Sequence, residues 1–346
     1  MSHKRRFGHF PSDETSRRKR KKKYHIEEAT DGLDKDTRTE PLKPKPPSNL
    51  AMNGLSKEDW KALEASQEKL PRFLFRAFGR KSGGNARLNK VTGIVPRGFL
   101  KGKKPTNIYD IPYLHGMICN HYQGGRRYNT EFSSWAACIT IAIFTVNYGT
   151  CKEYVAIIDR TLLAPHVKIY HVPDLFENIG PKRCCRGFHE YLAYGPINGP
   201  ALHCVSYRDI INNGYHSVAG HSYQIHSFSR PIFENVDNRV TTAKKLASLF
   251  RPSHDKRPDI IIALTAAFAS LSFCGPGTTS SGIVNKELLE SLLYYLHDEL
   301  NTIKSPPAGY KQLALVNSNM YTYGFPQLQQ MVALLGSIED EIRNYK

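Results

Sequence analysis

The chain has 346 residues, of which 40% are apolar, and its formal net charge of +17 favours anionic partners such as nucleic acid, nucleotides or acidic surfaces. Its seven cysteines contain no C-x-x-C pair, which argues against a disulfide-stapled secreted domain and against a zinc site. No apolar segment follows the charged N-terminus, and the longest apolar run, 260–274, is too short to span a bilayer. Together these features predict a soluble nuclear or cytoplasmic protein.

Residues 1–55 are predicted to form a disordered basic tail, because they are polar and rich in proline and show almost no apolar periodicity. Within them, residues 17–23 read RRKRKKK, seven consecutive cations. Such a cluster suits a nuclear import signal or a loose contact with nucleic acid. It equally suits a solvated tail that keeps the chain soluble, and both interpretations stay open.

Residues 56–69 are predicted as a short helix and linker, with Ser56 as the N-cap and Asp59 three residues later. A domain of class α+β is then expected over 70–212, because short strand-like segments alternate with Gly, Pro and Asn. These segments are 72–78, 92–96, 131–135, 153–159, 167–172, 190–195 and 201–208. The apolar segment 136–146 is compatible with a buried helix or a buried strand.

Residues 213–240 are expected to form a linker, and 241–346 a helical domain. Its predicted helices are 241–250, 259–273, 284–303 and 326–343. In the third, leucines recur at i, i+3 and i+4, which predicts one apolar face. They are Leu288, Leu289, Leu292, Leu293, Leu296 and Leu300.

Polar residues interrupt three of the apolar segments between 70 and 212: Arg76, the pair Ser133 and Ser134, and Glu190. Each has an ordinary structural interpretation when taken alone. An arginine in a strand often pairs with a core carboxylate, a serine can cap a helix, and a glutamate can begin a strand at the surface. Their shared order along the chain is what suggests a site.

In that order, the three positions resemble the Arg–Ser–Glu signature of ADP-ribosyltransferases of the cholera-toxin and heat-labile-enterotoxin type. The segments LFRAFGRKSGG, GIVPRGF, NIYD, FSSW and EYLAYGPI are similar to that family's successive motifs over about 70–208. EYLAYGPI also resembles a fungal family of uncharacterised domains. The resemblance implies a split β-sheet domain that takes NAD as its substrate and cleaves the nicotinamide–ribose bond.

By the same resemblance, Glu190 is the expected catalytic carboxylate and Ser133 the residue that holds it and the ribose. Arg76 is expected to bind NAD, Ser134 is a weaker candidate on the same strand, and His115 or His121 could assist near the acceptor. The chemistry is coherent, because a carboxylate stabilises an oxocarbenium-like state and an arginine fork suits a pyrophosphate.

Two departures from the family pattern restrict this hypothesis. Arginine-modifying members carry Glu-x-Glu, but the first position here is Phe188, and an apolar ring cannot act as a base. Transfer to arginine is therefore not expected, which leaves NAD hydrolysis or transfer to another protein or nucleic-acid acceptor. Trp135 stands where the family has a small residue, and we expect it to narrow or reshape the pocket. The competing hypothesis is an inactive binding module in a nuclear protein that contacts nucleic acid or protein.

Overall fold

The computed structural model describes residues 56–68, 70–79, 82, 85–100, 114, 116–118, 121, 130–137, 139, 142–143, 153–178, 190–219, 235–251, 257–272, 285–303 and 326–344. All of them belong to one compact unit, Pro41–Lys346. The expected disordered tail, 1–55, lies outside the described residues. Among these residues, no helix has both the length and the apolar character needed to cross a membrane.

The first part of this unit combines helices with antiparallel strands, which agrees with the expected α+β class. Its strands are β1 (Phe73–Phe78), β2 (Asn89–Lys90), β3 (Gly93–Ile94), β4 (Phe132–Ala136), β5 (Tyr154–Asp159), β6 (Lys168–His171), β7 (Glu190–Tyr194), β8 (Ile197–Asn198) and β9 (Leu202–Ser206). Its helices are α1 (Lys57–Gln67), α2 (Asn85–Leu88) and α5 (Val172–Asn178), with 3-10 turns η1 (Arg97–Phe99), η4 (Arg160–Leu162) and η5 (Gly199–Ala201).

Helices then follow without further strands among the described residues. They are α6 (Tyr207–Asn212), α7 (Tyr215–Ala219), α8 (Val236–Ser248), α9 (Pro258–Ala269), α10 (Lys286–Tyr295), α11 (His297–Thr302) and α14 (Pro326–Asn344), with the turn η6 (Ser270–Ser272) after α9. The predicted helix 284–303 is thus two helices. The apolar face predicted for its leucines is confirmed, because all six lie in or against one core.

The main sheet has six antiparallel strands in the order β6-β7-β4-β1-β5-β9. Strands β1 and β5 pair along six residues, from Phe73 with Asp159 to Phe78 with Tyr154. Strands β1 and β4, in contrast, share the single pair Phe75 with Ala136. The sheet therefore divides at this junction into the halves β6-β7-β4 and β1-β5-β9. A second sheet has the order β2-β3-β8.

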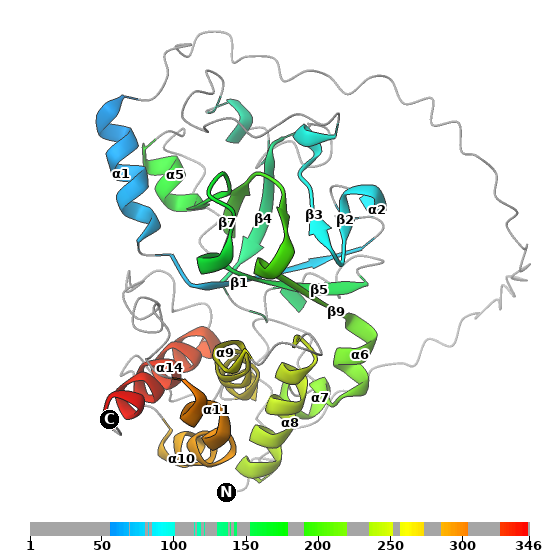
Figure 1. Ribbon diagram of the computed structural model, residues 1–346, viewed down its shortest axis with the longest axis vertical. Coiled ribbons are helices and arrows are strands. Elements are labelled where there is room, and N and C mark those ends of the chain that lie inside the picture. Colours follow the sequence, from blue (N-terminus) through cyan, green and yellow to red (C-terminus); the bar gives the residue numbers. More distant parts are fainter. Residues whose placement is uncertain are drawn as a thin grey trace, which may run out of the picture. The chain divides into compact units, whose positions relative to one another are not determined.

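Three apolar cores surround the main sheet. The largest joins Phe73 and Phe75 of β1 and residues of β5 and β9 to helices α8, α9, α10 and α14, which Figure 1 shows gathered beside that half of the sheet. Helices α1 and α5 share a second core with Phe132 of β4 and Leu192 of β7. The third core lies on the opposite face of these two strands, around Trp135 and Ile94. The regions expected as separate domains, 70–212 and 241–346, thus share one core.

Local chemistry explains where several elements begin. Ser56 caps α1 as predicted, because its Oγ accepts a hydrogen bond from the backbone N–H of Asp59 at 3.1 Å. Helix α9 is buried from Ile260 to Ala269, so it needs no polar face. Gly98 in η1 lies against Glu131, and a Cβ there would come within 2.4 Å of Glu131 Cγ, which explains the glycine.

A ring of four charged side chains joins the sheet to α9. Asp159 ends β5 and is fully buried, and it accepts hydrogen bonds from Arg72 Nε at 3.1 Å and Arg72 Nη2 at 2.8 Å. Arg257, the N-cap residue of α9, also donates to Asp159. Both arginines pair with Asp259 in the first turn of α9. The two positive and two negative charges balance, so each carboxylate keeps two cationic partners.

Candidate functional site

Arg76, Ser134 and Glu190 come together where the main sheet divides. Arg76 lies on β1, Ser134 on the adjacent β4, and Glu190 begins β7 on the other side of β4. Glu190 stands opposite Ala136 in the β4–β7 ladder, so its side chain leaves the same face as Ser134, two residues from Ala136. The hydroxyl of Ser134 acts to lower the pKa of Glu190, as a hydrogen-bond donor near the carboxylate does.

Arg76 occupies the gap between the two halves of the sheet. The β1–β4 ladder stops after one pair. If it continued in the same register, Ala77 would stand opposite Ser134. Instead, Arg76 Nη1 donates to the backbone oxygen of Ser134 at 2.6 Å. Its Nε atom is buried and has no hydrogen-bond partner among the described residues. The guanidinium group thus retains a donor that nothing described in the fold uses.

Burial dominates the electrostatics of these groups. It raises the pKa of Glu190 above its usual value, although the hydrogen bond from Ser134 and the charge of Arg76 act in the opposite direction. Burial also lowers the pKa of Arg76 to about 10, against the attraction of Glu190. Arg76 therefore remains a cation at neutral pH, and the site holds a carboxylate whose ionisation the protein does not favour.

Ser133, the serine first expected to hold Glu190, faces the other side of the sheet. It is only 4% exposed, its Oγ accepts the indole N–H of Trp135 at 2.9 Å, and it donates to the backbone oxygen of Ala193 at 3.5 Å. The structure thus brings Ser134, and not Ser133, together with Arg76 and Glu190. Successive strand residues point to opposite faces, which is why the neighbouring serine differs so completely.

Trp135 packs in the core on that same far side, with 2% of its surface exposed. It alternates with Ser134 and so cannot project toward Glu190. The expectation that its ring narrows the pocket is therefore wrong. Its indole instead gives the buried Ser133 hydroxyl a hydrogen-bond donor.

His121 joins the site from the segment before β4. Its Nε2 lies 2.9 Å from Ser134 Oγ, and its Nδ1 lies 2.5 Å from Thr130 Oγ1. Its ring meets Phe132 edge to face. Burial and the nearby charge of Arg76 lower the pKa of His121 to about 4, so it is neutral at physiological pH. The sequence indicated His121 only as one of two histidines, without a spacing that singled it out.

Several residues of the sequence hypothesis lie outside the described residues. They include His115 and Phe188. Within the described ranges there is no group of three or more His, Cys, Asp or Glu side chains that could hold a metal ion. The polar groups described around the Ser134 hydroxyl are thus the guanidinium of Arg76, the carboxylate of Glu190, the neutral imidazole of His121 and, beyond it, the hydroxyl of Thr130.

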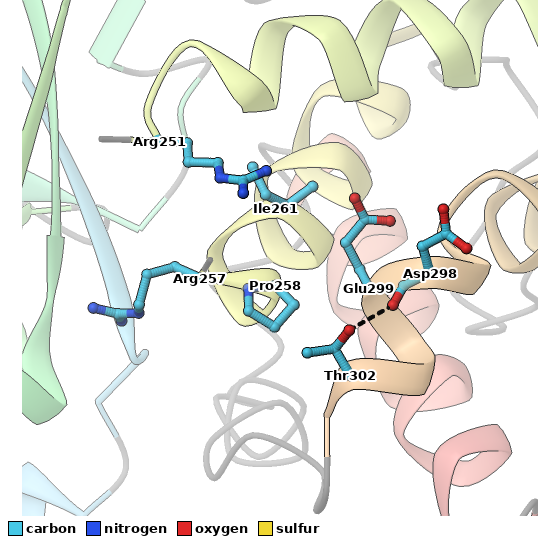
Figure 2. A pocket seen from close by; sticks show the side chains of 7 residues that line it. All are labelled: Arg251, Arg257, Pro258, Ile261, Asp298, Glu299 and Thr302. Atoms are coloured by element: carbon cyan, nitrogen blue, oxygen red, sulfur yellow. Dashed lines mark hydrogen bonds between the residues drawn. The ribbon is translucent and has the colours of Figure 1, made fainter. Parts of the chain in front are cut away.

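A separate hollow of about 110 Å³ lies among the C-terminal helices, away from these residues. Figure 2 shows it between Arg251 and α11, where Thr302 donates to the backbone oxygen of Asp298, while Arg257 extends away from Glu299. Arg257 is bound in the charged ring, and Glu299 pairs with Lys244 at 2.8 Å. These two charges are already compensated by the protein.

Comparisons with known proteins found one family match, and it covers the main sheet from β1 to β9. Residues 69–210 match a family described as Domain of unknown function (DUF7587). Strands β1, β4 and β7, which carry Arg76, Ser134 and Glu190, lie inside the matched region, as does Thr130 before β4. No curated protein and no solved structure was found to match the chain.

Proposed function

We propose that this protein binds NAD and cleaves its nicotinamide–ribose bond, as an ADP-ribosyltransferase-like or NAD glycohydrolase-like enzyme. The observation that carries the proposal is the convergence of Arg76, Ser134 and Glu190 from three neighbouring strands at the division of the sheet. The order of these residues resembles the Arg–Ser–Glu signature of the enterotoxin-like transferases. Ser134 takes the part in this proposal that the sequence assigned to Ser133.

In this proposal, Arg76 binds the dianionic pyrophosphate of NAD. Its charge is retained at neutral pH, and its buried Nε has no partner among the described residues. A planar guanidinium presents donors in a fixed fork, which matches phosphate oxygens better than an ammonium group does. Because Arg76 Nη1 donates to the backbone oxygen of Ser134, the orientation of the guanidinium group, and so of its Nε–H, is set before any ligand binds.

Glu190 is the catalytic carboxylate in this proposal. As the bond from ribose C1′ to the nicotinamide nitrogen breaks, the electron pair leaves with nicotinamide and positive charge develops on the ribose. An ionised Glu190 stabilises that charge, and Ser134 keeps the carboxylate in position. Because burial makes the free carboxylate costly, its attraction for a developing cation is strong. In hydrolysis, water adds to C1′ and releases one proton, giving ADP-ribose.

The acceptor is a separate question from the NAD chemistry. The net charge of +17 supports an anionic macromolecule as partner, and the position of Phe188 argues against arginine as the acceptor. This charge also supports the alternative function, an inactive module that contacts nucleic acid or protein. That alternative predicts binding to DNA or RNA that weakens steeply with salt, with no NAD turnover.

The test is release of nicotinamide from NAD by the purified full-length chain, with NAD affinity measured by calorimetry. Glu190→Gln should abolish turnover and keep NAD binding, whereas Arg76→Lys should weaken binding. Glu153→Gln, which changes a glutamate just before β5, is the matched control and should behave as the wild type. Absence of both binding and turnover would refute the proposal. Binding of NAD without turnover would favour the inactive module.

A further inference from the structure

Asn89 of β2 carries a buried amide that the fold does not use. Only 7% of the residue is exposed, and its Nδ2 atom has no hydrogen-bond partner among the described residues. Asparagine is depleted in strands, and a buried amide without a partner costs free energy that an apolar side chain would not cost. Because buried polar side chains are hydrogen-bonded in the large majority of cases, this donor needs an explanation. A ligand that supplies an acceptor is such an explanation.

The side chain of Asn89 lies on the face of the second sheet that packs against the main sheet. Asn89 stands opposite Ile94 in the β2–β3 ladder, and Ile94 stands opposite Ile197 in the β3–β8 ladder. Side chains of directly opposed residues leave a sheet on the same face. Both isoleucines belong to the third core, which they share with Leu74 and Phe78 of β1. The buried amide therefore borders the core that joins the two sheets.

Arg76 borders the same core from the main sheet. It lies between Leu74 and Phe78 on β1, and residues two apart leave a strand on the same face. Its Nη1 atom donates to the backbone oxygen of Ser134, whereas the edge formed by Nε and Nη2 makes no hydrogen bond with a described residue. Each sheet thus brings one side chain with unpaired N–H donors to the border of this core.

We propose that Asn89 is a second ligand-binding residue, whose amide donates, together with the Nε–Nη2 edge of Arg76, to the oxygen atoms of the NAD pyrophosphate. This inference rests on the proposed function and adds to it a residue from the second sheet. The oxygen atoms of a pyrophosphate dianion only accept hydrogen bonds, and the unpaired groups of Arg76 and Asn89 only donate them. Because Asn89 is neutral, it helps to orient the pyrophosphate without adding to the charge that attracts it.

The backbone around Asn89 suits a binding role. Asn89 pairs with Ile94 across the ladder, and the N–H of Val95 donates to the backbone oxygen of Leu88, the residue before Asn89, at 2.9 Å. The amide is thus presented from a paired strand, and its side chain is already buried before a ligand binds. Little conformational freedom remains to be lost on binding, which favours affinity.

The experiment measures affinity by calorimetry with the full chain, for NAD and separately for inorganic pyrophosphate. Asn89→Leu keeps the approximate size of the side chain and removes the amide, so it should weaken the binding of both ligands about tenfold. Asn89→Asp replaces the donor with a carboxylate and should weaken binding further, because like charges would meet. Asn198→Leu changes an exposed asparagine of β8 in the same sheet, and as the matched control it should stay within about twofold of the wild type.

Thermal melts of the free protein separate a ligand-binding role from a structural one. An amide that the fold does not use adds nothing to stability, so Asn89→Leu should raise the melting temperature while it weakens binding. A structural amide would give a lower melting temperature instead. If Asn89→Leu does not fold, Asn89→Ala, which introduces no larger side chain, decides through the same two affinities.

The outcomes distinguish this inference from the proposed function. Unchanged affinities in Asn89→Leu, tighter binding in Asn89→Asp, or a lower melting temperature in Asn89→Leu would overturn the inference alone. A wild type that binds pyrophosphate but not NAD refutes the proposed function, and the pyrophosphate affinities of the variants then decide the role of Asn89. A wild type that binds neither ligand refutes both.

Discussion

The charged ring between the sheet and α9 predicts that Asp159→Asn will be far more damaging than Asp259→Asn. Asp159 is fully buried and holds both Arg72 and Arg257, while the side chain of Asp259 is 17% exposed. Loss of the Asp159 charge leaves two largely buried guanidinium groups with one carboxylate between them. Removing one member of a buried ion pair costs about 3 to 5 kcal/mol. For Asp259→Asn we expect about half of that, because Asp259 is itself partly exposed and the buried Asp159 still pairs with both arginines.

The assay is urea denaturation of the full chain, followed by circular dichroism and by tryptophan fluorescence. The pKa of Asp159 is lowered by its hydrogen bonds to Arg72 and Thr161, which outweigh burial. Its stabilising effect is therefore complete above the unfolded-state pKa and is lost as the pH falls through the lower folded-state pKa. Wild type and Asp159→Asn should thus differ at pH 7 and converge in acid.

Two results would refute this reasoning. Equal losses for the two variants would show that burial does not determine the cost. Separate transitions for the two probes would show that the sheet and the C-terminal helices do not unfold together, against the core they share. The exposed carboxylate of Asp209 offers a control, and Asp209→Asn should change the free energy of unfolding by less than about 0.5 kcal/mol.

Two further predictions concern other parts of the fold. Folding lowers the pKa of His121 from 6.5 to about 4, so the unfolded chain takes up a proton at a higher pH than the folded chain does. The free energy of unfolding should therefore drop by about 3 kcal/mol as the pH falls through this range. His121→Asn should flatten that part of the urea-midpoint profile, and an unchanged profile would contradict the pKa. Gly98→Ala should cost about 1 to 3 kcal/mol through its contact with Glu131, whereas Gly336→Ala, with open space in α14, should stabilise. Thermal melts that rank the two glycine variants in the other order would contradict this.

Much of the fold could be predicted from the sequence, because most elements have a local signal. Alternation and turn residues indicated β1, β5, β7 and β9 nearly to the residue, and the leucine spacing indicated α10. Strands β2 and β8 were not predicted, since two residues carry no periodicity. The order of the strands, and the division between β1 and β4, depend on contacts far apart in the chain, which local pattern does not contain.

The choice between Ser133 and Ser134 shows where local pattern stops being informative. A strand with one solvent-facing side reveals its faces by alternation, but β4 has an apolar core on both sides, with Phe132 in one and Trp135 in the other. The sequence FSSWA therefore does not indicate which face of the strand carries Ser133 and which carries Ser134. Only the register with β7, in which Ala136 faces Glu190, decides that Ser134 shares the side of the carboxylate.

Two groups of buried charges in this protein differ in a way that separates stability from function. The ring around Asp159 is self-sufficient: its charges balance, and the fold lowers the pKa of its buried carboxyl. At Glu190 the fold raises the pKa of the carboxyl, and the adjacent Arg76 keeps a buried donor without a partner among the described residues. A buried donor without a partner and a carboxyl whose ionised form is disfavoured by burial add nothing to the stability of a fold. A ligand with an anionic part for Arg76 and a cationic centre for Glu190 would complete both groups, and NAD has both.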